Sequence, residues 1–499
     1  MKTDNKTKLG MTEKKEENFS AWYQELILKS ELIDYYPVKG CYVMRPNSFF
    51  VWSQIKKEFT SMIEGENVKE YYFPMLVTMD SLNKEKDLIE NFAPELAWVT
   101  KFGSEQLEVP YAIRPTSETI IYPYFSKWIQ TYRDLPVKTN QWCNVFRAEI
   151  TQTVPFLRSK EFLWQEGHSI FLNRKEAEDD TRKILEFYKK IYEELLAVPV
   201  IEGRKTDHEK FGGADYTLTT EIYIPDSGRA IQGATSHFLG QNFSKAFRIE
   251  IEDELKQKTF LYQNSWGITT RSIGIAAMLH SDNKGLLLPP RVCPVQVIIV
   301  PCGISKKTDK NKLYEKIEQL RNKLREHGIR AESDLRENYS PGFKFNYYEM
   351  TGVPIRINLG PRDVENNTLE IVRRDDNSVD KLDNQGIHEI VRERLEDIQR
   401  RLYLNALRKR DQKLKTAASF PEFLERLNED SIILVEFCNT KDCEISIKKE
   451  SSVVENGEVK KMGAKSLCIP FKYQGELTEN KCFKCGNQSV NRTLFGRSY

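Results

Sequence analysis

Residues 142–168 carry charged, aromatic and hydroxyl side chains in an order that suits the binding of a phosphorylated ligand. The stretch opens with the apolar run WCNV, continues as FRAE at residues 146–149, and then passes through a segment with two threonines and Pro155. Proline has no amide hydrogen to give to a strand ladder, so this middle segment predicts a loop. We therefore expect two antiparallel strands joined by that loop.

Alternate residues of a strand point to the same face of the sheet. Arg147 and Glu149 are thus expected to share a face, and so are four residues of the second strand: Phe162, Trp164, Glu166 and His168. Arg158 adds a second guanidinium, and such groups meet phosphate oxygens through paired hydrogen bonds. The hairpin would present these groups to one cavity. The alternative is a surface ion pair between Arg147 and Glu149 on an ordinary hairpin.

Three further segments have compositions that could supply a binding site. RPTSET at residues 114–119 places Thr116 and Glu118 in one direction, although it would also serve as a helix N-terminus. KFGGA at residues 210–214 sets Phe211 beside two glycines, and QGATSH at residues 232–237 is small and polar. The alternatives are a hydrophobic plug for Phe211 and a core histidine for His237.

WGITTRSIG at residues 266–274 predicts a strand that delivers Arg271 to the start of an apolar helix. A basic residue is unfavourable at a helix N-terminus, because the helix dipole is positive there, so Arg271 should have an anionic partner. Earlier in the chain, apolar residues at helical spacing predict a helix that Asn47-Ser48 can cap and Gly65 ends. EYYFP at residues 70–74 then reads as a strand closed by proline.

The composition excludes several classes of protein. The chain has 499 residues, a net charge of +2, 11% aromatic and 30% charged residues, which fits roughly three globular domains. No apolar run approaches the roughly 20 residues that span a bilayer. Nine cysteines, an odd number, argue against a secreted disulfide scaffold and for a reducing compartment such as the cytoplasm. Residues 1–18 are polar and lack an apolar core, so they predict a disordered tail rather than a signal peptide.

The C-terminal half changes character. From residue 295, strands alternate with helices, which predicts a small domain with a mostly parallel sheet. A strongly basic helix follows at residues 392–415. Two close cysteine pairs then predict one structural zinc site, with four free buried thiols as the alternative. The proposed zinc ligands are Cys438, Cys443, Cys482 and Cys485.

The FRAE segment, its loop, Arg158, Phe162 and Glu166 together fill every position of motif 2 of the class II aminoacyl-tRNA synthetases, which this chain resembles. The helix and strand before residue 74 resemble motif 1, which forms the homodimer interface in that family, and WGITTRSIG resembles motif 3. RPTSET is similar to the amino-acid-binding loop of prolyl-tRNA synthetases, and the chain is identified as a member of their archaeal and eukaryotic cytosolic type.

The resemblance implies an α+β protein with three domains after the tail. It implies a class II antiparallel-sheet catalytic domain at 19–290, an α/β anticodon-binding domain at 291–400 and a zinc-binding α+β domain at 401–499. The implied reaction is ATP-dependent ligation of L-proline to tRNA(Pro) through a prolyl-adenylate, with Mg²⁺ bound to ATP. A cytoplasmic homodimer without an insertion-type editing domain is expected.

The resemblance also implies roles for individual residues. Catalysis is expected from Arg147 and Arg271. The expected proline-binding residues are Thr116, Glu118, Arg147, Trp164, Glu166, His168, Phe211 and His237. The expected ATP-binding residues are Arg147, Glu149, Arg158, Gln232, Thr235, Thr269 and Arg271. The expected anticodon-binding residues are Glu349, Arg356, Arg362 and Asp363, for which ordinary surface charges are the alternative.

Two rival functions remain open on the sequence. A threonyl-type enzyme of the same subgroup would share the three motifs, but RPTSET and an apolar pocket without a catalytic zinc argue against it. An inactive paralogue that only binds tRNA would tend to lose the phosphate-binding arginines, and Arg147, Arg158 and Arg271 are all present.

Overall fold

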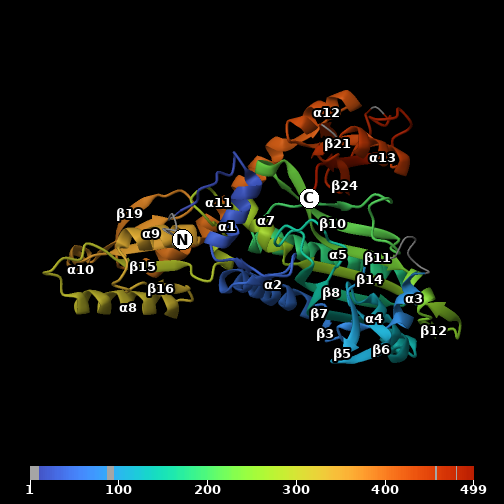
Figure 1. Cartoon of the computed structure of the whole chain (residues 1–499), viewed down its shortest axis with the longest axis horizontal. Coiled ribbons are helices and arrows are strands. Elements are labelled where there is room, and N and C mark those ends of the chain that lie inside the picture. Colours follow the sequence, from blue (N-terminus) through green and yellow to red (C-terminus); the bar gives the residue numbers. More distant parts are fainter. Residues whose placement is uncertain (1–9, 87–94, 456–457, 479) are drawn as a thin grey trace.

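The computed structural model describes residues 10–86, 95–455, 458–478 and 480–499. Figure 1 shows an elongated molecule in which a broad sheet with its helices occupies one end and a smaller domain the other. A C-terminal domain lies beside the broad sheet, and the long helix α11 (Ile387–Lys413) runs between these parts. The predicted boundary between residues 400 and 401 falls inside this helix.

An 11-stranded sheet runs through the first and last domains. In spatial order, its strands are β20 (Leu414–Thr416), β21 (Ile432–Phe437), β25 (Asn491–Gly496), β24 (Lys465–Pro470), β9 (Ile201–Arg204), β10 (Tyr216–Ile224), β11 (Arg229–Gly240), β14 (Tyr262–Thr269), β8 (Glu161–Phe171), β7 (Val137–Phe146) and β3 (Lys69–Glu70). The ladders from β24 to β7 are antiparallel, and β3 joins β7 in parallel. The expected hairpin is β7 and β8.

Three helices cover one face of this sheet: α2 (Pro46–Glu64), α5 (Arg174–Lys190) and α7 (Arg271–His280). Phe59 of α2 stacks on Tyr188 of α5, with ring centroids 5.0 Å apart, and Trp266 of β14 lies 6.1 Å from Phe59. These rings are fully or nearly fully buried, so they form the apolar layer that fixes the helices to the sheet.

The pleat of β8 separates two sets of side chains. Phe162, Trp164, Glu166 and His168 point away from the helices into a cavity. The residues between them face the helices, where the Tyr188 hydroxyl donates to Gln165 Oε1 at 2.8 Å and Ser169 donates to Asp180 Oδ2 at 2.7 Å. Gln165 and Ser169 therefore have hydrogen-bond partners on the helix side, while the alternate residues of β8 line the cavity.

Shorter elements complete the first domain. They are α1 (Phe19–Lys29), β1 (Ile33–Tyr35), β2 (Tyr42–Met44), β4 (Leu76–Val77), α3 (Met79–Lys86), β5 (Trp98–Phe102), β6 (Glu105–Ile113), α4 (Glu118–Trp128), η1 (Tyr132–Asp134), the π turn η2 (Ile191–Leu195), η3 (Pro225–Ser227), α6 (Asn242–Ala246), β12 (Glu250–Glu252), β13 (Lys258–Phe260) and η4 (Pro290–Val292). Strands β4, β6 and β5 form a small sheet beside α4.

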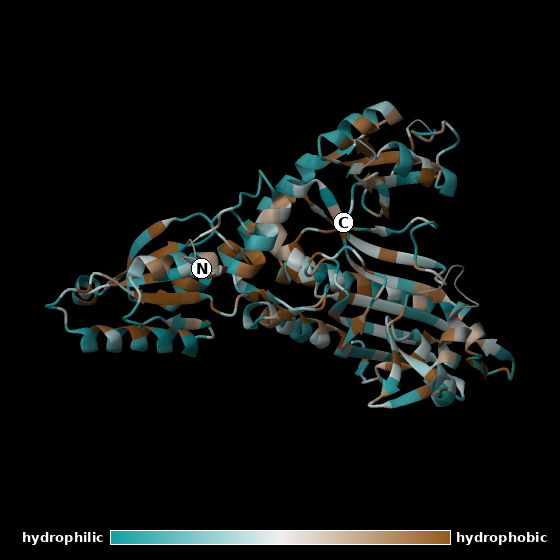
Figure 2. Cartoon of the chain, in the orientation of Figure 1, coloured by the Kyte–Doolittle hydropathy of each residue, from teal (hydrophilic) through white to brown (hydrophobic). Residues whose placement is uncertain are grey.

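The middle domain has a five-stranded sheet in the order β16-β15-β17-β18-β19. Its elements are β15 (Val297–Pro301), α8 (Lys310–Glu326), β16 (Ala331–Ser333), α9 (Pro341–Met350), β17 (Ile355–Leu359), α10 (Pro361–Asn366), β18 (Thr368–Arg373) and β19 (Val379–Asp383). The first three strands in that order are parallel, as expected, and β18 and β19 add antiparallel pairs. Figure 2 shows hydrophobic strands here and a largely hydrophilic α8.

The C-terminal domain adds α12 (Phe420–Asn428), α13 (Lys441–Glu450), β22 (Val453–Glu455) and β23 (Glu458–Lys461) to its share of the large sheet. Its strand β24 pairs directly with β9 of the first domain. Lys205, a buried residue just after β9, also donates to the Leu467 carbonyl at 2.7 Å. The domain is thus joined to the first one by a continuous ladder, which spacing along the chain did not predict.

Two local expectations differ from the structure. Helix α2 begins at Pro46, and Ser48 lies inside it with its hydroxyl bonded to the Leu32 carbonyl at 2.6 Å, so Asn47-Ser48 is not the cap. The strand expected at 70–74 pairs only at β3. Two further bonds join it to β7, from Tyr71 N to Asn140 O and from Phe73 N to Gln141 Oε1. Proline at 74 limits the ladder.

The predicted disordered tail lies partly outside the described residues, at 1–9. Its remaining part is packed rather than disordered. Lys15 is buried, donates to the Ser281 carbonyl at 3.0 Å and pairs with Asp226 at 2.7 Å. Its ammonium also lies over the Trp22 ring, 4.9 Å from the centroid. The prediction was wrong for residues 10–18, because a cationic side chain with a long apolar stem can be buried when charge and ring partners come from elsewhere in the fold.

Among the helices of the described ranges, none is long and apolar enough to cross a membrane.

Gly167 of β8 is expected to tolerate no side chain. A Cβ there would meet the Trp266 ring at 2.1 to 2.3 Å, in the layer between sheet and helices. Gly167→Ala should lower the free energy of unfolding by about 1–3 kcal/mol, as overpacked cores do. The measurement is the urea midpoint at constant slope. Gly342→Ala is the control, since a Cβ at Gly342 meets nothing within 4 Å and alanine suits its helix. Equal stability of Gly167→Ala and wild type would contradict this packing.

Candidate active site

A cavity of about 430 Å³ opens on the face of the sheet opposite to α2, α5 and α7. Its walls come from β8, β10, β11 and β14, from the loop between β7 and β8, and from the residues that precede α4. Every residue predicted to bind proline or ATP lines this one cavity. They are Thr116, Glu118, Arg147, Glu149, Arg158, Trp164, Glu166, His168, Phe211, Gln232, Thr235, His237, Thr269 and Arg271.

Arg147 and Glu149 reach the cavity from a turn rather than from a strand. Strand β7 ends at Phe146, Arg147 N makes a last bond to Lys160 O at 2.7 Å, and the chain then turns. The expectation that they alternate on a strand was therefore wrong, although both line the cavity. The Arg147 guanidinium lies over Phe162 and Trp164, 5.3 and 5.8 Å from the ring centroids, so aromatic faces orient it.

None of the three arginines in the cavity, Arg147, Arg158 and Arg271, forms an ion pair with a carboxylate among the described residues. Arg271 donates instead to the carbonyls of Leu157 and Gln232, at 3.0 and 3.1 Å. Burial lowers the pKa of both Arg147 and Arg271 from its ordinary value, and each remains a cation at neutral pH. The cavity therefore holds positive charge that an anionic ligand can neutralise.

Glu166 is the centre of a buried hydrogen-bond network. Its Oε1 accepts from the Ser117 hydroxyl and from Gln141 Nε2, the latter at 2.6 Å. His168 Nε2 lies 3.3 Å from its Oε2, and the Tyr122 hydroxyl meets His168 Nδ1 at 3.0 Å. Each partner is fixed by another, so the carboxylate and the imidazole keep one orientation toward the cavity.

Glu118 is buried at the first position of α4, where the positive end of the helix dipole favours a carboxylate. The Thr116 hydroxyl donates to Glu118 Oε2, so the two side chains meet as expected. The preceding Arg114 is 1% exposed and donates to the carbonyls of Phe73 and Asn144 at 2.7 and 3.0 Å. It thereby fixes this loop to the end of β7. The segment does begin a helix, but neither hydroxyl caps it, because Thr116 bonds to Glu118 and Ser117 bonds to Glu166.

Phe211 and His237 form an aromatic wall, with ring centroids 4.7 Å apart. Both imidazole nitrogens have hydroxyl partners, Thr217 Oγ1 at Nδ1 (2.8 Å) and Thr235 Oγ1 at Nε2 (3.0 Å). A neutral ring, with one donor and one acceptor nitrogen, satisfies both hydroxyls. Burial, with a smaller contribution from His168, lowers the pKa of His237 to about 3.

Several residues of the site were missed by the sequence analysis. Glu209 and Thr217 line the cavity, and Ser117, Gln141 and Tyr122 hold the residues that do. Gln141 could have been found from the hairpin register, in which it stands directly opposite Glu166. Tyr122 and Glu209 had no comparable signal, because only the fold brings α4 and the turn after β9 to the sheet.

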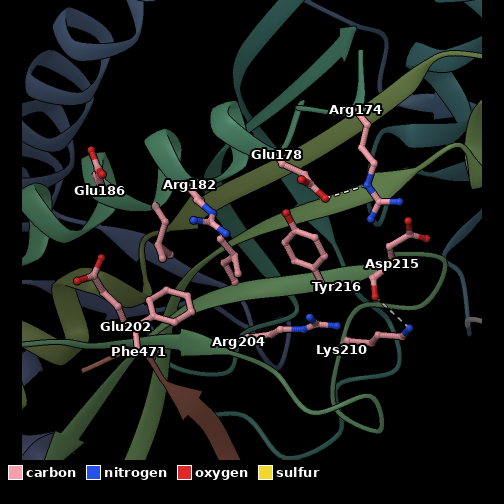
Figure 3. A pocket seen from close by; sticks show the side chains of 12 residues that line it. Arg174, Glu178, Arg182, Glu186, Glu202, Arg204, Lys210, Asp215, Tyr216 and Phe471 are labelled. Atoms are coloured by element: carbon pink, nitrogen blue, oxygen red, sulfur yellow. Dashed lines mark hydrogen bonds and ion pairs between the residues drawn. The ribbon is translucent and has the colours of Figure 1, made fainter. Parts of the chain in front are cut away.

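A second, larger hollow of about 920 Å³ lies behind β10 and contains none of the predicted site residues (Figure 3). Tyr216 and Leu218 line it, whereas Thr217 between them lines the candidate site, so the two hollows lie on opposite faces of one strand. Arg174 pairs there with Glu178 at 2.9 Å. Chemistry rather than size therefore identifies the smaller cavity as the candidate site.

The predicted anticodon residues all lie in the middle domain. Arg356 of β17 stacks on Phe345, 3.9 Å from the ring centroid, and Glu349 pairs with Lys284 at 3.0 Å. Asp363 accepts from the Gly360 amide at 3.0 Å and pairs with Lys381, which is the behaviour of a helix-capping residue. Arg362 is exposed beside it.

The four predicted zinc ligands come together at the end of β21, on α13 and in the turn at residues 482–485. The Sγ atoms of Cys443 and Cys482 are 3.8 Å apart, and those of Cys438 and Cys485 are 3.7 Å apart. A tetrahedral site with Zn–S bonds of about 2.3 Å has sulfur atoms about 3.8 Å apart. The residues therefore fit a zinc ion. Phe437 and Phe483 pack in the same apolar cluster.

Comparison with known proteins places the fold and the cavity in one class. The family model "tRNA synthetase class II core domain (G, H, P, S and T)" matches residues 100–280, which contain the whole candidate site, and "Anticodon binding domain" matches residues 296–394. The catalytic sheet is thus that of a class II aminoacyl-tRNA synthetase. The model "Prolyl-tRNA synthetase, C-terminal" matches residues 420–499.

Curated relatives define the family more narrowly. The chain is 51% identical to "Proline--tRNA ligase" of Encephalitozoon cuniculi, over 99% of this chain and 100% of that one. It is 47% identical to "Proline--tRNA ligase, cytoplasmic" of Arabidopsis thaliana, over 99% and 92%, and 40% identical to "Proline--tRNA ligase 2" of Clostridioides difficile, over 97% of each. The chain belongs to the proline--tRNA ligase family.

His237 is expected to stay neutral between about pH 7 and pH 5, because its pKa in the folded chain is about 3. Unfolded histidine binds a proton near its ordinary pKa of about 6.5. Below that pH the unfolded chain therefore gains a proton that the folded chain does not, and this residue destabilises the fold by at most about 1.4 kcal/mol per pH unit.

His237→Gln removes this dependence. Its stability relative to wild type should therefore improve as the pH falls, as measured by urea unfolding at each pH. The His237 imidazole resonance should also keep its neutral position in the same range. A resonance that titrates near pH 6.5 would contradict a neutral His237 imidazole in the folded chain.

Proposed function

We propose that this chain attaches L-proline to tRNA(Pro) at the expense of ATP, in two steps. A carboxylate oxygen of proline attacks the α-phosphorus of ATP, so that the bond to the departing pyrophosphate breaks and prolyl-adenylate forms. A hydroxyl of the terminal ribose of tRNA then attacks the prolyl carbonyl, and AMP leaves. The names of the curated relatives support the substrates, and the matched class II core supports the chemistry.

The three arginines without carboxylate partners are the observation that carries the proposal. ATP brings several negative charges into a cavity where Arg147, Arg158 and Arg271 have no ion pair among the described residues. Arg147 would neutralise the charge that develops on the α-phosphate, and the other two would hold the phosphate tail. No protein nucleophile is required, since positioning and electrostatics can supply the rate.

The proline end of the cavity is supported by its hydrogen-bonding capacity. The secondary ammonium of proline has two N–H donors, and Thr116 and Glu118 offer a hydroxyl and a buried carboxylate beside each other. Trp164, Phe211 and His237 supply flat surfaces for the pyrrolidine ring, with Glu166 and His168 behind them. Gln232, Thr235 and Thr269 remain for the nucleotide.

Mg²⁺ would enter with ATP and neutralise phosphate charge. Glu149, an exposed cavity carboxylate without a hydrogen bond or ion pair in the described structure, has the hard oxygen donors that this ion prefers. The tRNA would meet the middle domain, where Arg356 and Arg362 carry guanidiniums that can read a base edge and Glu349 and Asp363 offer acceptors.

Three further features of the proposal rest on the family and on local structure. A homodimer through α2 and β3 is supported by the position of β3 at the edge of the large sheet and by Tyr72, which is 78% exposed beside it. A cytoplasmic site of action is supported by the Arabidopsis relative, which is named as the cytoplasmic enzyme. An insertion-type editing domain is not expected, since the chain between β8 and β14 builds α5 and the strands β9 to β11 of the same sheet.

The test is proline-dependent exchange of pyrophosphate into ATP by the purified chain, with alanine and threonine in parallel. Exchange that is fastest with proline is expected. Exchange that depends on threonine, or tRNA binding without any exchange, would overturn the proposal in favour of a threonyl-type enzyme or an inactive paralogue respectively.

Arg147→Ala should lower proline-dependent exchange by about 10²–10³-fold and leave the fold intact, because it removes one charge-stabilising group from a partly buried site. The measurement is kcat for exchange, with unfolding curves of the same preparations. Arg400→Ala, an arginine on α11 with a 71% exposed side chain, is the matched control and should exchange like wild type. Near-normal exchange by a well-folded Arg147→Ala variant would remove Arg147 from the mechanism.

The double variant Cys482→Ser/Cys485→Ser should lose the one zinc equivalent bound by the four cysteines. Four thiolates complete a tetrahedral site and leave no position for a reacting water, so this metal is structural and its loss should loosen the C-terminal domain. Proline activation should survive. The measurements are zinc content, protease resistance of residues 420–499 and exchange rate. Cys302→Ser, in the middle domain, is the control and should keep the zinc.

Two results would count against this assignment. Wild-type chain without zinc would overturn the metal site, and loss of exchange with an intact first domain would show that the metal is more than structural.

A further inference from the structure

A second cluster of metal-ligating side chains joins the turn after β9 to the C-terminal domain. His208 and Glu209 belong to the turn, and Glu444 belongs to α13, next to Cys443. One potential ligand atom from each of the three residues lies within 4.8 Å of the other two. These residues are separate from the four cysteines and from the predicted catalytic set.

The turn is fixed against the C-terminal domain, so the cluster has a rigid frame. Thr206 Oγ1 lies 3.1 Å from Ser466 Oγ of β24, and the amides of Glu209 and Lys210 donate to the Thr206 carbonyl at 3.1 and 3.0 Å. Ser466 in turn donates to Glu444 Oε2 at 3.0 Å. One hydroxyl pair therefore connects the backbone of the turn to the carboxylate on α13.

The two oxygens of the Glu444 carboxylate differ, because Oε2 accepts from Ser466 and Oε1 does not have such a partner. The residue is 6% exposed, and its Oε1 is buried with no hydrogen bond among the described residues. A buried acceptor left unsatisfied costs about 1–3 kcal/mol, and more when it is charged. A cation at this oxygen would remove the cost.

The neighbouring side chains do not place a cation at Glu444 Oε1. His208 forms no ion pair with either glutamate, and the two carboxylates approach each other with like charge. The Lys465 ammonium pairs with Glu209, at 4.0 Å, and not with Glu444. One imidazole nitrogen and two carboxylate oxygens form the N/O donor set that Zn²⁺ accepts, with a fourth position for water.

We propose that His208, Glu209 and Glu444 bind a second zinc ion that links the turn after β9 to the C-terminal domain. Glu209 also lines the active-site cavity, and Phe211 follows it by two residues, with its amide bonded to Thr217 Oγ1 at 3.0 Å. The ion would therefore hold in place the segment that carries the Phe211 wall. This consequence rests on the proposed function, whereas zinc binding itself does not.

The test is the zinc content of the full chain after gel filtration at micromolar free Zn²⁺, with the four-cysteine site loaded. Wild type should hold two equivalents. His208→Ala and Glu444→Gln should hold one, with affinity for the second ion weakened at least about tenfold, since even outer-shell changes cost about 10–100-fold. His208 is exposed, so its variant should fold even if Glu444→Gln does not.

His327→Ala is the matched control, because His327 is also exposed and its ring centroid lies 3.7 Å from that of His388, a pair that could take up zinc by itself. This variant should keep two equivalents. One equivalent in wild type, two in His208→Ala, or loss of the second ion in His327→Ala would each overturn the proposal.

Kinetic measurements distinguish the effect of the second zinc ion on the Phe211 segment from the binding of the ion itself. His208→Ala should raise the KM for proline several-fold and leave kcat and the KM for ATP unchanged, and excess Zn²⁺ should have no effect on this variant. The same KM change in a His208→Ala chain that still holds two zinc ions would overturn the ion as the link. Failure of the proposed function would instead abolish proline-dependent exchange in wild type, with zinc content unaffected.

Discussion

The alternation of side chains along β8 is the constraint on which the rest of the structure depends. Glu166 and His168 must point into the cavity, so Gln165, Gly167 and Ser169 must point to the helices. On the helix side, Tyr188 bonds to Gln165 and Asp180 bonds to Ser169. Gly167 has no side chain and so leaves room for the Trp266 ring. A shift of one residue in register would exchange the two sets and bury the acidic network in the aromatic layer.

The acidic and the basic side chains of the cavity have different kinds of partners. The carboxylates Glu118 and Glu166 are tied into hydrogen bonds with hydroxyl, amide and imidazole groups of the protein. The guanidiniums of Arg147 and Arg271 contact rings and carbonyls instead, neither of which cancels their charge. In the proposed reaction, this arrangement would keep positive charge available for phosphate and would hold the acidic groups in fixed positions for a cationic amine. An ion pair between the two sets would have removed both properties.

The C-terminal domain is joined directly to the sheet that carries the candidate site. Strand β24 continues the large sheet beyond β9, and Lys205 and Thr206 bind its residues. The turn that follows carries Glu209 and Phe211 to the cavity wall. These contacts connect the C-terminal domain to a short segment beside the cavity, whose two ends are hydrogen-bonded to different domains.

The sequence alone determined the β7–β8 hairpin, the facing set on β8, the delivery of Arg271 to a helix start and the four cysteines, because strand period, proline, and cysteine spacing are local properties. From those elements and the family resemblance, all predicted proline- and ATP-binding residues were expected to share one cavity. Only the tertiary structure placed Arg147 on a turn, packed Lys15 into the first domain, joined β24 to β9, and brought Tyr122, Gln141 and Glu209 to the site. Each of these depends on a contact between segments far apart in the chain, and the spacing of residues along one segment carries no record of which distant segment will face it.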